Sequence, residues 1–162
     1  MAEQTLAYLS PIAFQLGIIK LPGIEFSTQM ANLPGISMPE ATQHNPFVNA
    51  PVPGDKLEFE PFTMNFLVDE SMANYISIWS WMIGLGFPND YSEFIDGANR
   101  PLVHMSDGFL QILGSNNVLV KTVKFTDMFP ISLNSITFTS TENNVTYVQG
   151  QVTFKYTSFK FE

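Results

Sequence analysis

The sequence predicts a mainly β fold of the α+β class, an antiparallel β-sandwich or barrel with one flanking α-helix. Three observations indicate this fold. Apolar and polar residues alternate with a period of two over several stretches, Gly, Pro and Asn residues separate those stretches, and one stretch has helical spacing. At 162 residues the chain fits a single domain, expected over 1–162, that can bury a sizeable core.

The first two strands are expected before residue 31. Ile12, Phe14 and Leu16 alternate with small or polar residues within 11–20. A Leu-Pro-Gly turn follows, because Pro presets φ and Gly tolerates positive φ. Residues 24–30 alternate again, so the pattern predicts a hairpin.

Residues 32–55 are expected to form an extended arm. Prolines interrupt this segment repeatedly, and each lacks the N–H that a central strand needs. Its apolar side chains would be costly to leave in water, so we expect an ordered arm that docks on another surface; a loose surface loop is the alternative. The candidate contact residues are Pro34, Ile36, Met38, Phe47, Val48, Pro51 and Pro53.

A long strand and the helix come next. The strand is expected over 56–68, and its alternation changes phase at Pro61, which is typical of a bulge or an edge position. Ser71 suits the N-cap of the helix, and Gly84 and Gly86 suit its end. One helical face is expected to pack on the sheet as part of the core; it carries Met72, Tyr75, Ile76, Trp79, Met82 and Ile83.

The remaining chain is expected to be irregular to residue 105 and then built from strands. These strands are predicted over 108–113, 118–128, 135–140 and 145–161, with turns at 116–117 and 142–144. In the last strand Val152, Phe154 and Tyr156 share one face, whereas Phe159 and Phe161 share the other. A bulge near Ser158, or burial of both faces, would explain the change.

The composition restricts the classes of function that the chain can have. Charged residues make up only 14% of the chain and apolar residues 45%, which indicates that other protein covers much of the surface. The net charge is −8, with 7 Lys and Arg against 15 Asp and Glu. Tight DNA binding needs the opposite excess, so a groove binder is excluded but a conduit for DNA is not. The acidity could also serve solubility alone.

No motif argues for catalysis, and we expect a structural protein without cofactor or metal. The chain has no Cys, which excludes disulfides and thiol nucleophiles and fits a reducing cytoplasm. His44 and His104 lack metal-ligand spacing. Glu58 and Glu60 share a strand face, but two solvated acids explain them more simply. The N-terminus lacks the basic patch of a signal peptide, and the apolar run at 76–87 is too short to span a membrane.

Two stretches resemble the tail-tube protein family of contractile-tailed bacteriophages. The first comprises 30–36 (MANLPGI) and, after the arm, 52–70 (VPGDKLEFEPFTMNFLVDE), followed by a helix with Tyr75, Ile76, Trp79 and Trp81. The second begins at Val118, passes through Phe129-Pro130 and Leu133, and ends with the strand at 152–156 (VTFKY). The order and spacing of these motifs carry the resemblance.

This resemblance implies a structural subunit of the tail tube of the virion, assembled in the host cytoplasm. Six subunits would close into a ring, and stacked rings would form the hollow tube through which DNA passes without specific binding. In such a tube the arm at 32–55 is the candidate ring-to-ring or tube-to-sheath contact. The implied partners are further copies, the tail sheath, the baseplate hub or tube initiator, the tape-measure protein and the tail-terminator protein. The inner-tube protein of type VI secretion shares the implied fold.

Two alternatives stay open. The chain could be a tube-family baseplate, tube-initiator or tail-completion protein, present in few copies at a tube end. It could also be a monomeric β-sandwich binding module.

Polar strand faces are the candidate lining of the lumen, where acidic and amide groups would let DNA slide. The strands expected to supply them are 25–30, 56–68, 118–127 and 146–157. The candidate lumen-facing residues are Glu25, Ser27, Gln29, Glu58, Glu60, Thr122, Lys124, Gln149, Gln151, Thr153 and Lys155.

Overall fold

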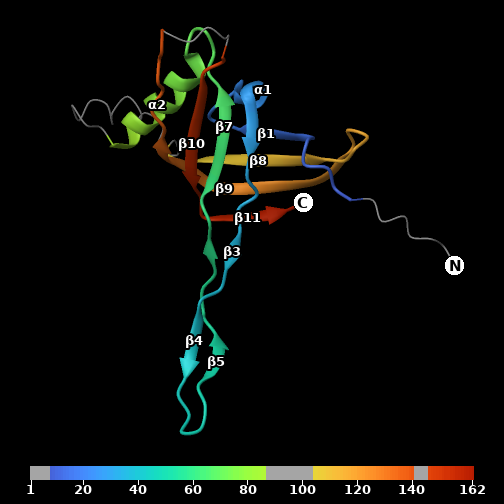
Figure 1. Ribbon diagram of the computed structural model, residues 1–162, viewed down its shortest axis with the longest axis vertical. Helices are drawn as coiled ribbons and strands as arrows, with labels where there is room; N and C mark the ends of the chain where they lie inside the picture. The colour runs from blue at the N-terminus through green and yellow to red at the C-terminus, as the bar shows by residue number, and fades with distance from the viewer. Residues whose placement is uncertain (1–7, 87–103, 141–145) are drawn as a thin grey trace, which may run out of the picture.

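A computed structural model of the chain describes residues 8–86, 104–140 and 146–162. Its main sheet is antiparallel and seven-stranded, and β11 pairs with β9 beside the main path (Figure 1). Along that path the strands are β1 (Phe14–Ile18), β8 (Ser106–Leu113), β9 (Leu119–Leu133), β10 (Gln149–Lys155), β7 (Phe62–Leu67) and β2 (Thr28–Ala31), and β11 is Ser158–Phe161. The described strands do not close into a barrel. The expected mainly β, antiparallel fold is confirmed.

Strand β9 belongs to two layers of this sheet. Its first part pairs with β8 and β11, and its last residues pair with β10. Between them Asp127 has a φ of 56°, a left-handed conformation that Asp tolerates better than most residues. The Asp127 N–H donates to the Asp107 carboxylate (3.2 Å), which holds the bend. We call β1, β8, β11 and the start of β9 the first layer, and β2, β7, β10 and the end of β9 the second.

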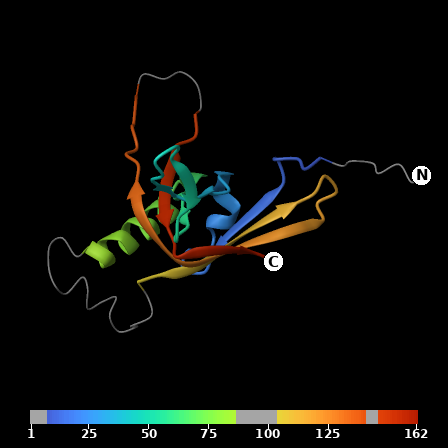
Figure 2. The same ribbon diagram turned by 90° about the horizontal axis from the view of Figure 1, so that it is seen from below.

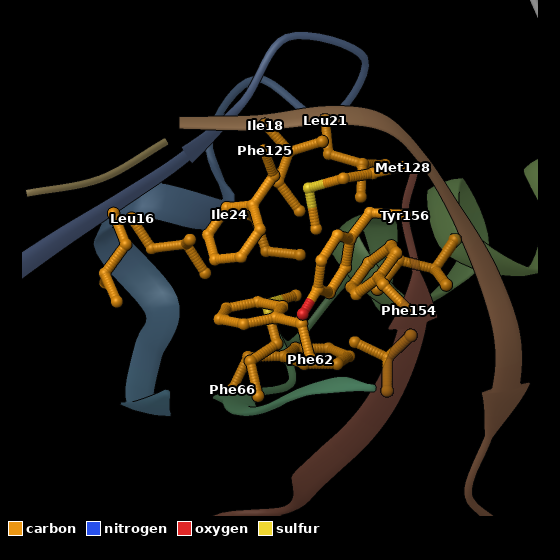
Figure 3. Close-up of a cluster of buried hydrophobic side chains, with 14 of the residues drawn as sticks. Leu16, Ile18, Leu21, Ile24, Phe62, Phe66, Phe125, Met128, Phe154 and Tyr156 are labelled. Atoms are coloured by element: carbon orange, nitrogen blue, oxygen red, sulfur yellow. The ribbon is translucent and has the colours of Figure 1, made fainter. Parts of the chain in front are cut away.

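The core lies between the two layers and is rich in aromatic rings (Figure 3). Phe125 comes from the first layer and Phe62 from the second, and their ring centroids are 5.0 Å apart. Tyr156 packs edge-on against Phe125 at 5.1 Å, an arrangement that aromatic quadrupoles favour. The largest fully buried side chains are Phe62, Phe66, Phe125, Phe154, Leu16, Ile24, Met64, Ile78, Met128, Val123 and Val152.

The predicted hairpin of the first two strands is wrong. Strand β1 pairs with β8, and β2 pairs with β7. The start of the second predicted strand is instead one helical turn, α1 (Ile24–Ser27), entered through Gly23 at a φ of 97°. The hydroxyls of Ser27 and Thr28 both donate to the Ile24 carbonyl, at 3.2 and 2.8 Å, and local bonds of this kind compete with a strand ladder.

Helix α2 (Ala73–Gly86) packs on β9, but the predicted core face is wrong in part. Ile78 and Trp81 are its buried residues, whereas Ile76 and Trp79 are 50% and 52% exposed. Tyr75 does pack against the core. The remaining members of the predicted face, Met72, Met82 and Ile83, are partly buried.

The start of α2 explains its rotation. Met72 has a φ of 55°, so Ser71 is not the cap and the helix begins later. The Asn74 side chain accepts from the Tyr75 N–H (2.8 Å) and donates to the Leu67 carbonyl (2.6 Å), which ties the first turn to β7. Further along, Trp81 donates to the His104 carbonyl (3.1 Å). Apolar residues lie on most sides of the helix, so the apolar spacing does not single out the buried face, which these anchors select.

The C-terminal strands also differ from expectation. Residues 135–140 form no strand, because β9 continues to Leu133 and takes the place beside β10. The predicted turn at 142–144 lies outside the described residues. The last predicted strand breaks after Lys155, where the chain passes from β10 to β11 in the other layer. This change of layer, and not a bulge at Ser158, brings Phe159 back against Phe125.

The arm is a two-stranded ribbon that extends from the sandwich along the long axis of the molecule (Figure 1). At its base β3 (Ile36–Ser37) pairs with β6 (Glu58–Phe59), and farther out β4 (Glu40–Gln43) pairs with β5 (Ala50–Pro53). Strand β6 was predicted as part of one long strand with β7. The chain interrupts that strand at 60–61, so the ribbon extends beyond residue 55.

We predict that Trp81→Ala destabilises the fold by about 3–5 kcal/mol, because Trp81 is only 5% exposed and its removal leaves a cavity. The matched change Trp79→Ala, on the same helix, is expected to cost about 0.5 kcal/mol or less. Urea unfolding of both variants measures the two free energies. Equal costs would contradict the helix orientation described above.

Candidate assembly surfaces

The second layer presents a polar face away from the core. Its side chains come from alternate residues of β7 and β10, because the intervening residues are buried. Gln149 donates to the Gln29 side chain (2.9 Å), and the Thr63 and Thr153 hydroxyls lie 3.4 Å apart. We call this surface the amide face; it comprises Gln29, Thr63, Asn65, Gln149, Gln151, Thr153 and Lys155.

The sequence-predicted lumen residues divide among four places. Gln29, Gln149, Gln151, Thr153 and Lys155 belong to the amide face. Others lie on the outer side of the first layer, where Lys124 pairs with Glu162 at 3.6 Å. Thr122 and Lys124 line a cavity of about 380 Å³ there. The side-chain amide of Gln15, in β1 of the same layer, donates to the Glu25 carboxylate (3.5 Å).

The other three candidates are placed differently. Ser27 uses its hydroxyl within α1 and accepts from Asn74, whereas Glu58 and Glu60 lie at the base of the arm. Orientation toward a lumen stays a prediction for all of these residues. The amide face holds the largest contiguous group of them.

Glu60 has a structural task at the root of the arm. Its carboxylate accepts from the Gly35 N–H (3.1 Å), and its backbone carbonyl accepts from the Tyr156 hydroxyl (2.7 Å). On the other side Asn32 accepts from the Thr63 N–H (2.6 Å). These bonds fix the arm to β7 and to the end of β10, which supports a rigid ribbon base over a loose loop.

Burial, together with the smaller effect of the nearby Glu60 carboxylate, raises the pKa of Tyr156 to about 12. The phenol therefore stays protonated well above its usual range and keeps donating to the arm root.

The outer part of the arm exposes apolar side chains. Phe47 at the tip is 96% exposed, and Val48, Met38 and Ile36 are each more than half exposed. Pro51 and Pro53 lie on β5, opposite Thr42 and Glu40, whereas Pro34 is buried at the base. Exposed apolar residues on a projecting ribbon are typical of a contact with another protein.

The described residues contain no group of three His, Cys, Asp or Glu side chains placed to hold a metal ion. No helix in that part of the chain is long and apolar enough to cross a membrane.

Comparison with known proteins gives one informative relative. The chain is 28% identical over 141 residues to the tail tube terminator protein of Enterobacteria phage T4, an alignment that covers 84% of this chain and 77% of the relative. No family model matches the sequence.

Solved structures extend the comparison. A chain of an extracellular contractile injection system, from the PVC sheath/tube terminator in its extended state, superposes with a TM-score of 0.64 at 14% identity, covering 97% of this chain and 99% of that one. A chain of the tube-terminating cap of the anti-feeding prophage gives 0.61 at 16% identity and covers 100% and 99%. The chain has the tail-tube fold. Its resemblance to the tail-tube family is thereby confirmed.

A tail-tube fold also occurs in a chain of the anti-feeding prophage baseplate, with a TM-score of 0.63 at 8% identity over 92% of this chain and 90% of that one. A type six secretion system protein reaches 0.51 at 12% identity, covering 92% and 83%. These solved structures share the fold with this chain, but at such low identity they carry no information on residue roles.

Sequence reasoning missed two members of the amide face, Thr63 and Asn65. It placed Glu58 and Glu60 on the polar side of one continuous strand. The available signal was the change of phase at Pro61, which moves the polar positions of the second half to residues 63 and 65.

We predict that the free energy of unfolding of the Tyr156→Phe variant falls less at alkaline pH than that of the parent protein. In the parent protein the unfolded phenol ionises near pH 10 and the folded one near 12, so the free energy of unfolding falls as pH rises between these values. The variant lacks this contribution. Urea midpoints measured below and above pH 10 test it, with Tyr147→Phe, an exposed phenol, as the control. Identical pH profiles for parent and Tyr156→Phe would contradict the pKa shift.

Proposed function

We propose that this chain is a structural protein of a contractile tail and acts at an end of the tail tube, as a tube terminator. The observation that carries the proposal is the relationship to the T4 tail tube terminator, which extends over 84% of the chain. This is the tail-completion alternative of the sequence analysis, and it fits better than the repeating tube subunit.

The fold alone does not separate these two roles. Chains from a baseplate, a sheath–tube complex and two terminator assemblies superpose with TM-scores between 0.59 and 0.64. Preference for the tube end therefore rests on the sequence relative, which is more similar than any of these structures. A monomeric binding module has no comparable support.

The proposed partners are copies of the chain in a ring, the last ring of the tube and the sheath around it. The amide face would turn to the lumen, since its side chains are uncharged apart from Lys155. Such a lining lets DNA pass without specific binding, and the net charge of −8 opposes adhesion. The arm would reach along the tube axis to the neighbouring ring or to the sheath. The chain would reside in the virion tail after assembly in the host cytoplasm.

A structural role without catalysis is part of the proposal. In the arm, the His44 ring nitrogen Nδ1 lies 3.1 Å from the Asn49 side-chain oxygen, a neutral partner.

Addition of the purified chain to its cognate growing tubes tests the proposal. We predict that negative-stain microscopy shows the chain at one tube end only and that further elongation stops. Incorporation along the whole tube would identify a repeating subunit, and absence of tube binding would contradict both roles.

We also predict that Phe47→Asp combined with Val48→Asp lowers binding to tube ends at least tenfold, because charges replace the exposed apolar tip of the arm. Tyr147→Asp, an exposed aromatic residue outside the arm, is the matched control. Tube-end occupancy against protein concentration gives the affinity. Unchanged binding would show that the arm tip is not a contact.

A further inference from the structure

Helix α2 carries an uncovered apolar stripe on its outer side. Ile76 and Trp79 are half exposed, and Ile83 follows at helical spacing on the same side. The helix contains no charged residue along its length. We call Ile76, Trp79 and Ile83 the helix patch. Half-exposed Trp and Ile side chains gain free energy when another surface removes them from water.

A second uncharged apolar surface lies at the turn between β8 and β9. Val118, Leu119 and Val120 are each at least half exposed, and Ile12, just before β1, is 86% exposed. Because Phe14 pairs with Ile112 and the Leu113 N–H donates to the Ala13 carbonyl, the segment before β1 lies at the same end of the layer. Residues 4–19 and 108–120 contain no charged residue. We call Leu9, Ile12, Val118, Leu119 and Val120 the hairpin patch.

The two patches lie on opposite flanks of the sandwich. Figures 1 and 2 both show α2 on one side and the turn between β8 and β9 on the other. In Figure 1 the arm extends along the long axis, between these flanks. A contact between flanks therefore leaves the arm free for partners along that axis.

Charge indicates that another copy of this chain covers both patches. Each copy has a net charge of −8, so two copies repel each other except where their surfaces lack charge. Both patches meet this condition, and both are apolar. Two different patches on opposite flanks favour a head-to-tail contact, which closes into a ring when the rotation between copies permits.

We infer that the helix patch of one copy packs against the hairpin patch of the next, and that this contact closes the ring. The inference rests on the proposed function, in which the chain acts as a ring at a tube end, and it names the surfaces that the ring uses.

The cysteine-free sequence allows a direct test by crosslinking. The full chain is prepared with Trp79→Cys, with Val118→Cys and with both, and a short bismaleimide is added to the free protein and to protein bound at tube ends. The double variant is expected to give a ladder of covalent dimers, trimers and larger species, whereas each single variant stays monomeric. Ile76→Cys with Val120→Cys is a second pair, used if the first fails to fold by circular dichroism.

The control pairs Trp79→Cys with Phe138→Cys, an exposed residue outside both patches, and is expected to give no ladder. Dimers from either single variant would show a patch meeting itself, and would overturn the head-to-tail contact. Rings visible by microscopy without a ladder in either double variant would overturn the patches but leave the proposed function intact. Absence of rings both in solution and at tube ends would contradict both.

Discussion

The bend in β9 is the constraint on which the other features depend. One continuous strand serves both layers because the chain turns at Asp127, where the Asp107 carboxylate holds the backbone N–H. The bend places Phe125 above Phe62 and closes the core. It also sends the end of β9 to β10, so that the amide face looks away from the first layer.

The sequence predicted the parts of the fold that depend on local pattern. The helix and the strands around Leu110, Val123 and Val152 were correct because their apolar spacing is regular. The partners of β1 and β2 were not predictable, because pairing over long sequence distances leaves no local trace. Periodicity failed for α2, since apolar residues lie on most sides of this helix. Its orientation depends on Asn74 and Trp81, which bond to backbone outside the helix.

The residues of the candidate site also divide into those that local pattern predicts and those that it does not. Residues of β10 alternate regularly, so Gln149, Gln151 and Thr153 share one face as expected. Glu60 was placed on a lumen-facing strand, but its carboxylate bonds to Gly35 at the arm root. A carboxylate that closes a backbone contact cannot be distinguished in sequence from one that faces solvent. The low charge content predicts surfaces that other protein covers, and the exposed apolar side chains of the arm and of α2 agree with that prediction.

An acidic chain with few charges suits the proposed role, in which the protein would meet several protein surfaces without holding DNA. The central claim is that it occupies one end of the tube, and the copy number in purified tails tests this most directly. Quantitative mass spectrometry of tails with short and long tubes measures that number against the repeating tube protein. A terminator gives the same number of copies, one ring, at every tube length. A copy number that rises in proportion to tube length would contradict the account.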